Sequence, residues 1–151
     1  MKREKIQEAV KEVVLYVFET MYFMCPEVVA EAGPVPSVPK CCFKARVAVK
    51  NSSEVLMLYG SEQLVMEMGK NLLGTDWPIA ESYLIDVFKE AAGVIAGNLV
   101  TALALDSSIA IDVPVAERLD DCSQLRRHSG DREVVFNIGD EFFKIAVVMV
   151  S

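Results

Sequence analysis

Hydrophobic positions in the first part of the chain recur with the period of an α-helix. Over residues 3–24, apolar side chains return every three or four residues, and Lys and Glu fill most of the positions between them. This spacing gathers the apolar side chains on one face of a helix. Pro26 ends the pattern, because proline lacks the amide that a further turn needs. The proline-rich stretch 33–39 is expected to be an extended connector.

After this connector the period changes to two, which is typical of a strand with one buried face. Residues 42–50 and 54–59 predict the two strands of a hairpin, joined by a polar turn at 51–53. Ser61 then has the side chain of a helix N-cap, and Gly74 is suited to end a helix. A short helix is therefore expected between Ser61 and Gly74.

A long helix follows, opened by Asp76 and Pro78 and predicted over about 76–105. Three further strands are expected at 108–115, 132–138 and 142–150, the last two joined by a tight turn. The predicted order is α-β-β-α-α-β-β-β. This order indicates an α/β fold of the α+β kind, with helices packed against an antiparallel or mixed sheet.

Size, composition and charge exclude several classes of protein. A chain of 151 residues, spanning 1–151, suits a single domain, and 52% hydrophobic with 25% charged residues is an ordinary globular balance. The net charge of -7 argues against nucleic acid and against an anionic membrane surface, since both need clustered Lys and Arg. No targeting signal is visible, and apolar runs fall short of the roughly 20 residues of a membrane span. We therefore expect a cytoplasmic protein.

The cysteines and the single histidine do not have the spacing of a metal site. The four cysteines are Cys25, Cys41, Cys42 and Cys122. A zinc site usually presents ligands in pairs two to four residues apart, whereas here the only close pair is vicinal and His128 lies far from it. The sequence predicts no metal ligands. All four cysteines are expected to be buried, reduced thiols, and His128 a solvated loop residue.

Familiar enzyme signatures are absent from the chain. The segment 69–75 looks like a phosphate-binding loop, but its lysine follows the wrong glycine, and the segment is better explained as a helix end. There is no nucleophile elbow and no zinc-protease motif. Asp120 and Asp121 are expected to be solvated loop acids. An enzyme acting on a small molecule therefore has little support.

The long helix carries two different faces. At 100° per residue, its apolar positions form one broad face: Leu84, Phe88, Ala91, Ala92, Ile95, Leu99 and Leu103. On the opposite side lie Asp86, Lys89, Glu90, Gly93 and Gly97. Each glycine inside a helix costs about 1 kcal/mol relative to alanine. The two glycines therefore keep the helix backbone approachable for a partner, or they allow close packing within the protein.

The segment 86–98 resembles the signature helix of the CheC/CheX/FliY family of chemotaxis phosphatases. Members carry an acidic residue or serine, Glu four positions on, Asn three positions further, a Gly-Asn pair and a later proline. The matching positions are Asp86, Glu90, Gly97, Asn98 and Pro114. The block 17–21 of the first helix is similar to CheX-like members as well, so the resemblance covers almost the whole chain. It implies a CheX-like domain.

The resemblance also implies a partner and a site. In the family the Glu side chain contacts a conserved lysine of a phosphorylated response regulator, and the Asn amide orients the water that attacks the aspartyl phosphate. The expected partner is a phosphorylated, CheY-like receiver domain, bound through Asp86, Glu90, Gly93 and Gly97, with Glu90 as the catalytic or docking acid. Mg²⁺ would come from the receiver, with no cofactor of the protein's own. A homodimer is a further expectation, with 142–150 as a central or interface strand.

One position departs from the family pattern. Gly93 stands where the motif has Asn, and glycine has no side chain to hold a water in line with the acyl phosphate. Asn98 lies about 80° around the helix from Glu90, so we expect it to bond nearby backbone instead. Two functions stay open: hydrolysis of the receiver's aspartyl phosphate, or a catalytically degenerate adaptor or dimerisation module.

Overall fold

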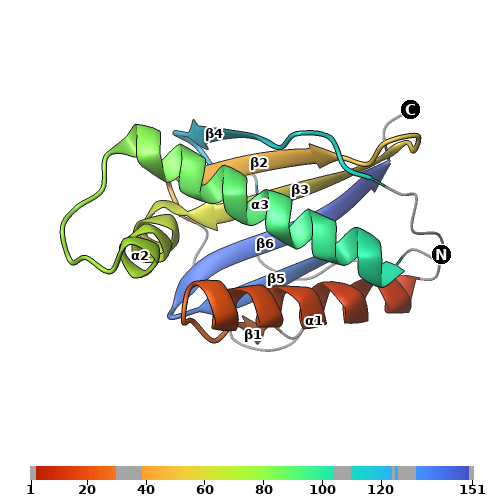
Figure 1. Cartoon of the computed structure of the whole chain (residues 1–151), viewed down its shortest axis with the longest axis horizontal. Helices are drawn as coiled ribbons and strands as arrows, with labels where there is room; N and C mark the ends of the chain where they lie inside the picture. Colours follow the sequence, from red (N-terminus) through yellow and green to blue (C-terminus); the bar gives the residue numbers. More distant parts are fainter. Residues whose placement is uncertain (1–2, 30–38, 104–109, 124, 126–131, 150–151) are drawn as a thin grey trace.

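The computed structural model describes residues 3–29, 39–103, 110–123, 125 and 132–149. In these residues, helices pack on one face of a six-stranded sheet (Figure 1). The elements are α1 (Arg3–Met21), β1 (Glu27–Val28), β2 (Cys42–Ala48), β3 (Glu54–Ser61), α2 (Glu62–Leu73), α3 (Glu81–Leu103), β4 (Val115–Leu119), β5 (Glu133–Ile138) and β6 (Glu141–Met149). The predicted α+β class and element order are confirmed, with the two-residue β1 as an addition.

The sheet is antiparallel between all neighbouring strands, in the order β1-β5-β6-β3-β2-β4. Each strand alternates its side chains between the two faces, and one face carries the main core under the helices. The strand β6 lies between β5 and β3. The apolar strand predicted over 142–150 is therefore a central strand of the sheet.

Aromatic contacts connect the helices to the centre of the sheet. The Phe143 ring on β6 lies 5.2 Å from Phe18 of α1 and 6.4 Å from Phe88 of α3, measured between ring centroids, both edge to face. Such pairs add about 1 kcal/mol each beyond the burial of their area. Figure 1 shows α1 and α3 crossing the same face of the sheet, with α2 at one end.

The helix ends follow local chemistry where a capping residue is present. The Ser61 hydroxyl accepts a hydrogen bond from the Leu64 amide at 3.1 Å, and Gly74 ends α2 in the left-handed region with φ 64°, as predicted. The helix α1 is shorter than the predicted 3–24. Its end has Phe23 at φ 57°, and the Met24 amide donates to the Phe18 carbonyl at 3.0 Å, which reverses the chain before Pro26.

Two predicted boundaries around the long helix are wrong. The helix α3 begins at Glu81, after a loop in which the Trp77 amide donates to the Thr75 hydroxyl at 3.1 Å. The strand expected at 108–115 is replaced by β4, and of residues 110–114 only Ile111 pairs before it, in an isolated bridge with Val49. Pro114 has no amide for a strand ladder, so regular pairing starts at the residue after it.

The prediction of four buried, reduced cysteines is wrong. A disulfide joins Cys42 to Cys122, while Cys25 is exposed and Cys41 is half-buried. The register of β2 against β4 places Cys42 opposite Leu119, which brings the chain after β4 back to the start of β2. The two cysteines are 80 residues apart in the sequence, so local spacing does not reveal the pair.

Some predictions fall outside the described residues. These are His128 and most of the proline-rich connector 33–39, together with the first part of the strand expected at 108–115. Within the described part of the chain, no helix has the length and hydropathy of a membrane span.

Candidate functional site

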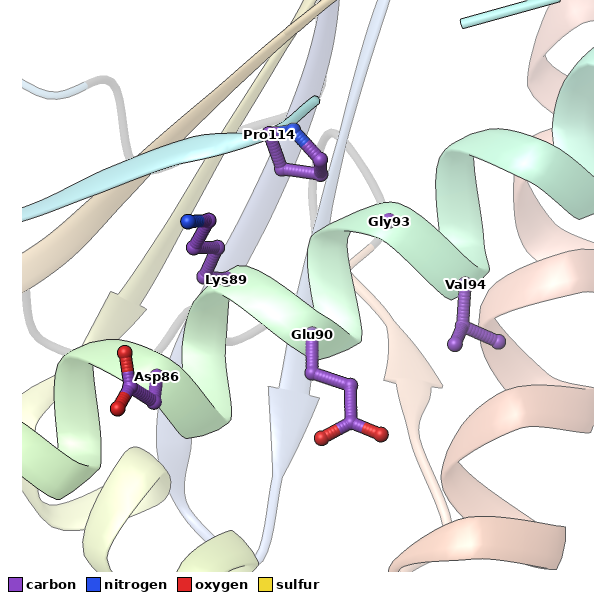
Figure 2. Close-up of a pocket in the computed structure, with 6 residues that line it drawn as sticks. All are labelled: Asp86, Lys89, Glu90, Gly93, Val94 and Pro114. Carbon is purple, nitrogen blue, oxygen red and sulfur yellow. The ribbon is translucent and has the colours of Figure 1, made fainter. Parts of the chain in front are cut away.

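The polar stripe of α3 forms one wall of an open pocket of about 400 Å³ (Figure 2). The residues lining it are Asp86, Lys89, Glu90, Gly93, Val94 and Pro114. All except Pro114 come from α3, and Pro114 lies directly before β4. Three of the four residues predicted to bind a partner are thus brought together. The fourth, Gly97, does not line the pocket.

The buried face of α3 turns these residues outward. The predicted core positions that are buried are Leu84, Phe88, Ala91, Ala92, Ile95 and Leu99. Leu103 is only partly buried, and Val87 and Ala96 are buried in addition. Asp86 and Glu90 are exposed on the opposite side, and Lys89 and Gly93 are half-buried. Hydrophobic packing against the sheet therefore orients the acidic side chains toward solvent.

Pro114 lies directly over the backbone of α3 at Gly93. A Cβ atom added to Gly93 would lie 3.1 Å from Pro114 Cγ, which is tighter than ordinary van der Waals contact. A Cβ atom on Gly97 would meet nothing within 4 Å. Close packing thus explains Gly93, while no contact within the described residues explains Gly97.

The charged groups of the pocket are available to a partner. Among the described residues, Asp86, Lys89 and Glu90 make no hydrogen bond and no ion pair. Figure 2 shows the Lys89 side chain on the same side of the helix as Pro114, and the Glu90 carboxylate on the opposite side. The pocket therefore presents an ammonium and carboxylates around the helix backbone at Gly93.

The pocket has no side-chain amide in the place where the family motif has one. The Asn98 amide donates to the Val94 carbonyl at 2.8 Å, which confirms the expected bond to helix backbone. This hydrogen bond holds the amide on the outer side of the last turns of α3. Neither Gly93 nor Asn98 is therefore suited to orient a water in the pocket.

Sequence reasoning missed Tyr22 as a neighbour of the site. Its side chain is fully buried just after α1. Burial raises the pKa of Tyr22, and the Glu90 carboxylate raises it further. No local pattern signals this, because Tyr22 follows α1 and Glu90 lies on α3, and these segments meet only in the folded protein.

A metal site was not predicted, and the described residues contain no group of three or more His, Cys, Asp or Glu side chains arranged to hold one.

No family model matches the sequence, and a comparison with curated proteins finds no significant match.

Solved structures, by contrast, match over nearly the full length of the chain. The chemotaxis protein CheX from Vibrio vulnificus has a TM-score of 0.65 at 14% identity, over 95% of this chain and 99% of that one. The CheX–CheY–BeF3–Mg²⁺ complex from Borrelia burgdorferi matches with a TM-score of 0.60 at 12% identity, over 98% and 97% of the two chains. FliY from Thermotoga maritima matches with a TM-score of 0.61 at 14% identity, over 97% of this chain and 91% of that one. The protein therefore has the fold of the CheX, CheC-like and FliY chemotaxis proteins over almost its whole described length.

Proposed function

We propose that the protein binds the phosphorylated receiver domain of a response regulator through the pocket on α3. The observation that carries the proposal is the exposed Glu90 carboxylate, which pairs with none of the described residues, on the outward stripe of a CheX-type helix. A CheX protein of this fold has been solved with CheY, BeF3 and Mg²⁺. On this proposal the protein is cytoplasmic, and the Mg²⁺ belongs to the receiver.

In this role Glu90 docks onto a cationic side chain of the receiver. A carboxylate without an intramolecular ion pair keeps its full charge for the partner, which favours fast and specific association. Asp86 lies one turn before Glu90 and forms the rim of the contact. Gly97 leaves the helix backbone uncovered one turn beyond Gly93, so the receiver can approach α3 closely there.

The lack of a side chain at Gly93 favours an adaptor over a phosphatase. Hydrolysis of an acyl phosphate depends on a water held in line with the leaving carboxylate, and such positioning contributes several kcal/mol to the rate. Here no side chain extends from Gly93, and the Asn98 amide is bonded to the Val94 carbonyl. We infer that the protein recognises the phosphorylated receiver and leaves the phosphoryl group in place.

Titration of receivers with and without BeF3 and Mg²⁺ tests the binding proposal. The parent should bind the BeF3 form more tightly, and Glu90→Gln should weaken that binding about tenfold, because a charge-assisted contact is lost. Glu117→Gln is a matched control. Glu117 is exposed on β4 next to Arg118, which points toward the helices, so Glu117 lies on the other face of the sheet. Equal affinity of the parent and Glu90→Gln, or no binding to any receiver of the same genome, would contradict the proposal.

Single-turnover decay of a phosphorylated receiver separates the adaptor from the phosphatase. The parent should not accelerate decay, whereas Gly93→Asn should, since it restores the water-orienting amide. Gly93→Ala is the control, because it adds the same Cβ atom against Pro114 without an amide. If the parent already accelerates decay, another group orients the water and the adaptor version is wrong.

A further inference from the structure

Large apolar side chains are exposed together at one end of the helical layer. They are Phe23 just after α1, Leu73 at the end of α2, Trp77 in the loop that follows, and Tyr83 in the first turn of α3. Phe23 and Trp77 are each 76% exposed. Figure 1 shows the end of α1, the end of α2 and the start of α3 at the same end of the molecule. We call these four residues the apolar patch. Exposed apolar surface that is gathered in one place marks a contact with another molecule.

An open hollow of about 350 Å³ joins separate parts of the apolar patch. Phe23 lines this hollow from the end of α1, and residues 74–76 line it from the loop between Leu73 and Trp77. Segments about 50 residues apart in the sequence therefore meet at one recessed surface.

The backbone that carries the apolar patch is fixed before any partner binds. The Asn71 side-chain amide donates to the Tyr22 carbonyl at 2.7 Å, which ties the end of α1 to α2. Phe23 follows at φ 57°, a conformation that bulky residues rarely adopt and that costs free energy. In the loop after α2, the Trp77 amide donates to the Thr75 hydroxyl at 3.1 Å. A preformed surface of this kind loses little conformational entropy on binding.

Tyr83 connects the apolar patch to the pocket on α3. It lies seven residues before Glu90, and at 100° per residue the two side chains point about 20° apart around the helix. Asp86, which is also exposed, lies between them on the same stripe. The Glu90 carboxylate points away from Pro114 (Figure 2). The acidic stripe therefore continues into the apolar patch at Tyr83.

The size of a protein interface places Tyr83 within reach of the same partner. A standard interface covers about 800 Å² of each protein, the area of a disc of about 16 Å radius. Tyr83 lies about 10 Å from Glu90 along the helix axis, and Gly97 lies as far from Glu90 in the other direction. A receiver centred on Glu90 therefore covers both residues. Since Gly97 has no side chain, the apolar contact has to come from the Tyr83 side.

We propose that the receiver domain also docks on the apolar patch, with Tyr83 as the aromatic anchor of the interface. The inference rests on the receiver binding proposed above and names the residues that give it affinity. Tyr and Trp are among the side chains that most often dominate the binding energy of an interface. Glu90 steers the encounter through its charge, and the apolar patch slows dissociation. The receiver then presents an apolar area beside the cation that meets Glu90.

The first test measures affinity for the BeF3 form of a receiver at low and high salt. Tyr83→Ala should weaken binding about tenfold at both salt concentrations, whereas the loss in Glu90→Gln should shrink at high salt, because salt screens charges. Trp77→Ala should weaken binding about threefold. Because Trp77 is 76% exposed, its removal leaves the fold intact, so this variant decides alone if Tyr83→Ala does not fold.

Val148→Ala is the matched control, and it should bind as the parent does. Val148 is 42% exposed on β6 and alternates with Val147, which belongs to the core under the helices, so Val148 lies on the other face of the sheet. Unchanged affinity in Tyr83→Ala and Trp77→Ala, with a loss in Glu90→Gln, overturns the aromatic anchor and leaves the proposed function standing. If the parent binds no receiver, the proposed function fails, and the anchor fails with it.

The second test uses Trp77, the single tryptophan of the chain, as a reporter. Its fluorescence emission should shift to shorter wavelength when a receiver without tryptophan binds, because a covered indole ring loses contact with water. Trp77→Phe gives the background signal. Unchanged emission at saturating receiver would show that the apolar patch stays uncovered and would overturn the inference.

Discussion

At the scale of single residues, the two glycines of α3 have different surroundings although they lie on the same stripe. Gly93 is covered by Pro114, and a Cβ atom there would be crowded. Gly97 is half-buried, yet a Cβ atom there would meet nothing within 4 Å. A helix glycine destabilises by about 1 kcal/mol relative to alanine. At Gly97 no contact among the described residues offsets this cost, which is consistent with a role in contacting a partner.

Gly97→Ala should therefore stabilise the isolated protein and weaken its complex. The free energy of unfolding should rise by about 1 kcal/mol, because alanine favours the helix and the added methyl group is unobstructed. Urea denaturation measures this change. Gly93→Ala is the comparison. Its free energy of unfolding should rise by less, because the added methyl group has to displace Pro114. A loss of stability in Gly97→Ala would show that the space above it is filled.

At the scale of elements, Arg118 connects the edge strand β4 to two helices. Its guanidinium lies 2.9 Å from Glu62 at the start of α2 and 3.0 Å from Glu81 at the start of α3, and it also pairs with Asp120. The hydrogen bond to Glu62 is the main cause that raises the pKa of Arg118. Because β4 directly follows Pro114, these ion pairs help to hold the Pro114 ring against α3.

Substitution of Arg118 should loosen this connection in a graded way. Arg118→Lys keeps the positive charge but loses the planar guanidinium that reaches two carboxylates at once. Arg118→Ala loses the charge and the guanidinium together. The melting temperature should fall in both variants, further in the alanine variant, and the difference from the parent should shrink at high salt.

The exposed Arg46 on β2 provides the control for these variants, since Arg46→Lys should leave the melting temperature unchanged. The amide signal of Gly93 reports the pocket, and it should shift in the Arg118 variants only. Equal melting temperatures of Arg118→Ala and the parent at low salt would show that the ion pairs contribute nothing measurable to stability.

At the scale of the whole molecule, the disulfide between Cys42 and Cys122 closes a loop of 80 residues in sequence separation. This loop contains β3, α2, α3 and β4, and therefore the whole pocket. A cross-link over a loop of this length lowers the entropy of the unfolded chain and stabilises the fold by about 4 kcal/mol on a chain-entropy argument.

Reduction of this disulfide should lower the free energy of unfolding by about 2–4 kcal/mol. Urea denaturation with and without a thiol reductant measures the effect. The double variant Cys42→Ala, Cys122→Ala should be insensitive to the reductant, whereas Cys25→Ser should respond as the parent does, because Cys25 is an exposed free thiol. Four reactive thiols in the unfolded, non-reduced protein would contradict the pairing.

Elements with strong local signals were predicted well from the sequence. The caps of α2 at Ser61 and Gly74 are confirmed, and the tight turn before β6 has Gly139 at φ 57° and Asp140 at φ 66°. Elements without such signals were misplaced. The start of β4 depends on its pairing with β2, and the start of α3 depends on the loop after α2, so neither boundary follows from periodicity.

In the site, too, some features follow from the local sequence and others depend on tertiary contacts. The sequence alone determined that α3 is a long helix with one apolar face and that Asp86 and Glu90 lie opposite it, because a helical period is a local property. Only the tertiary structure decided which distant residues meet that stripe. It placed Pro114 on Gly93, because sheet register and helix packing set such contacts.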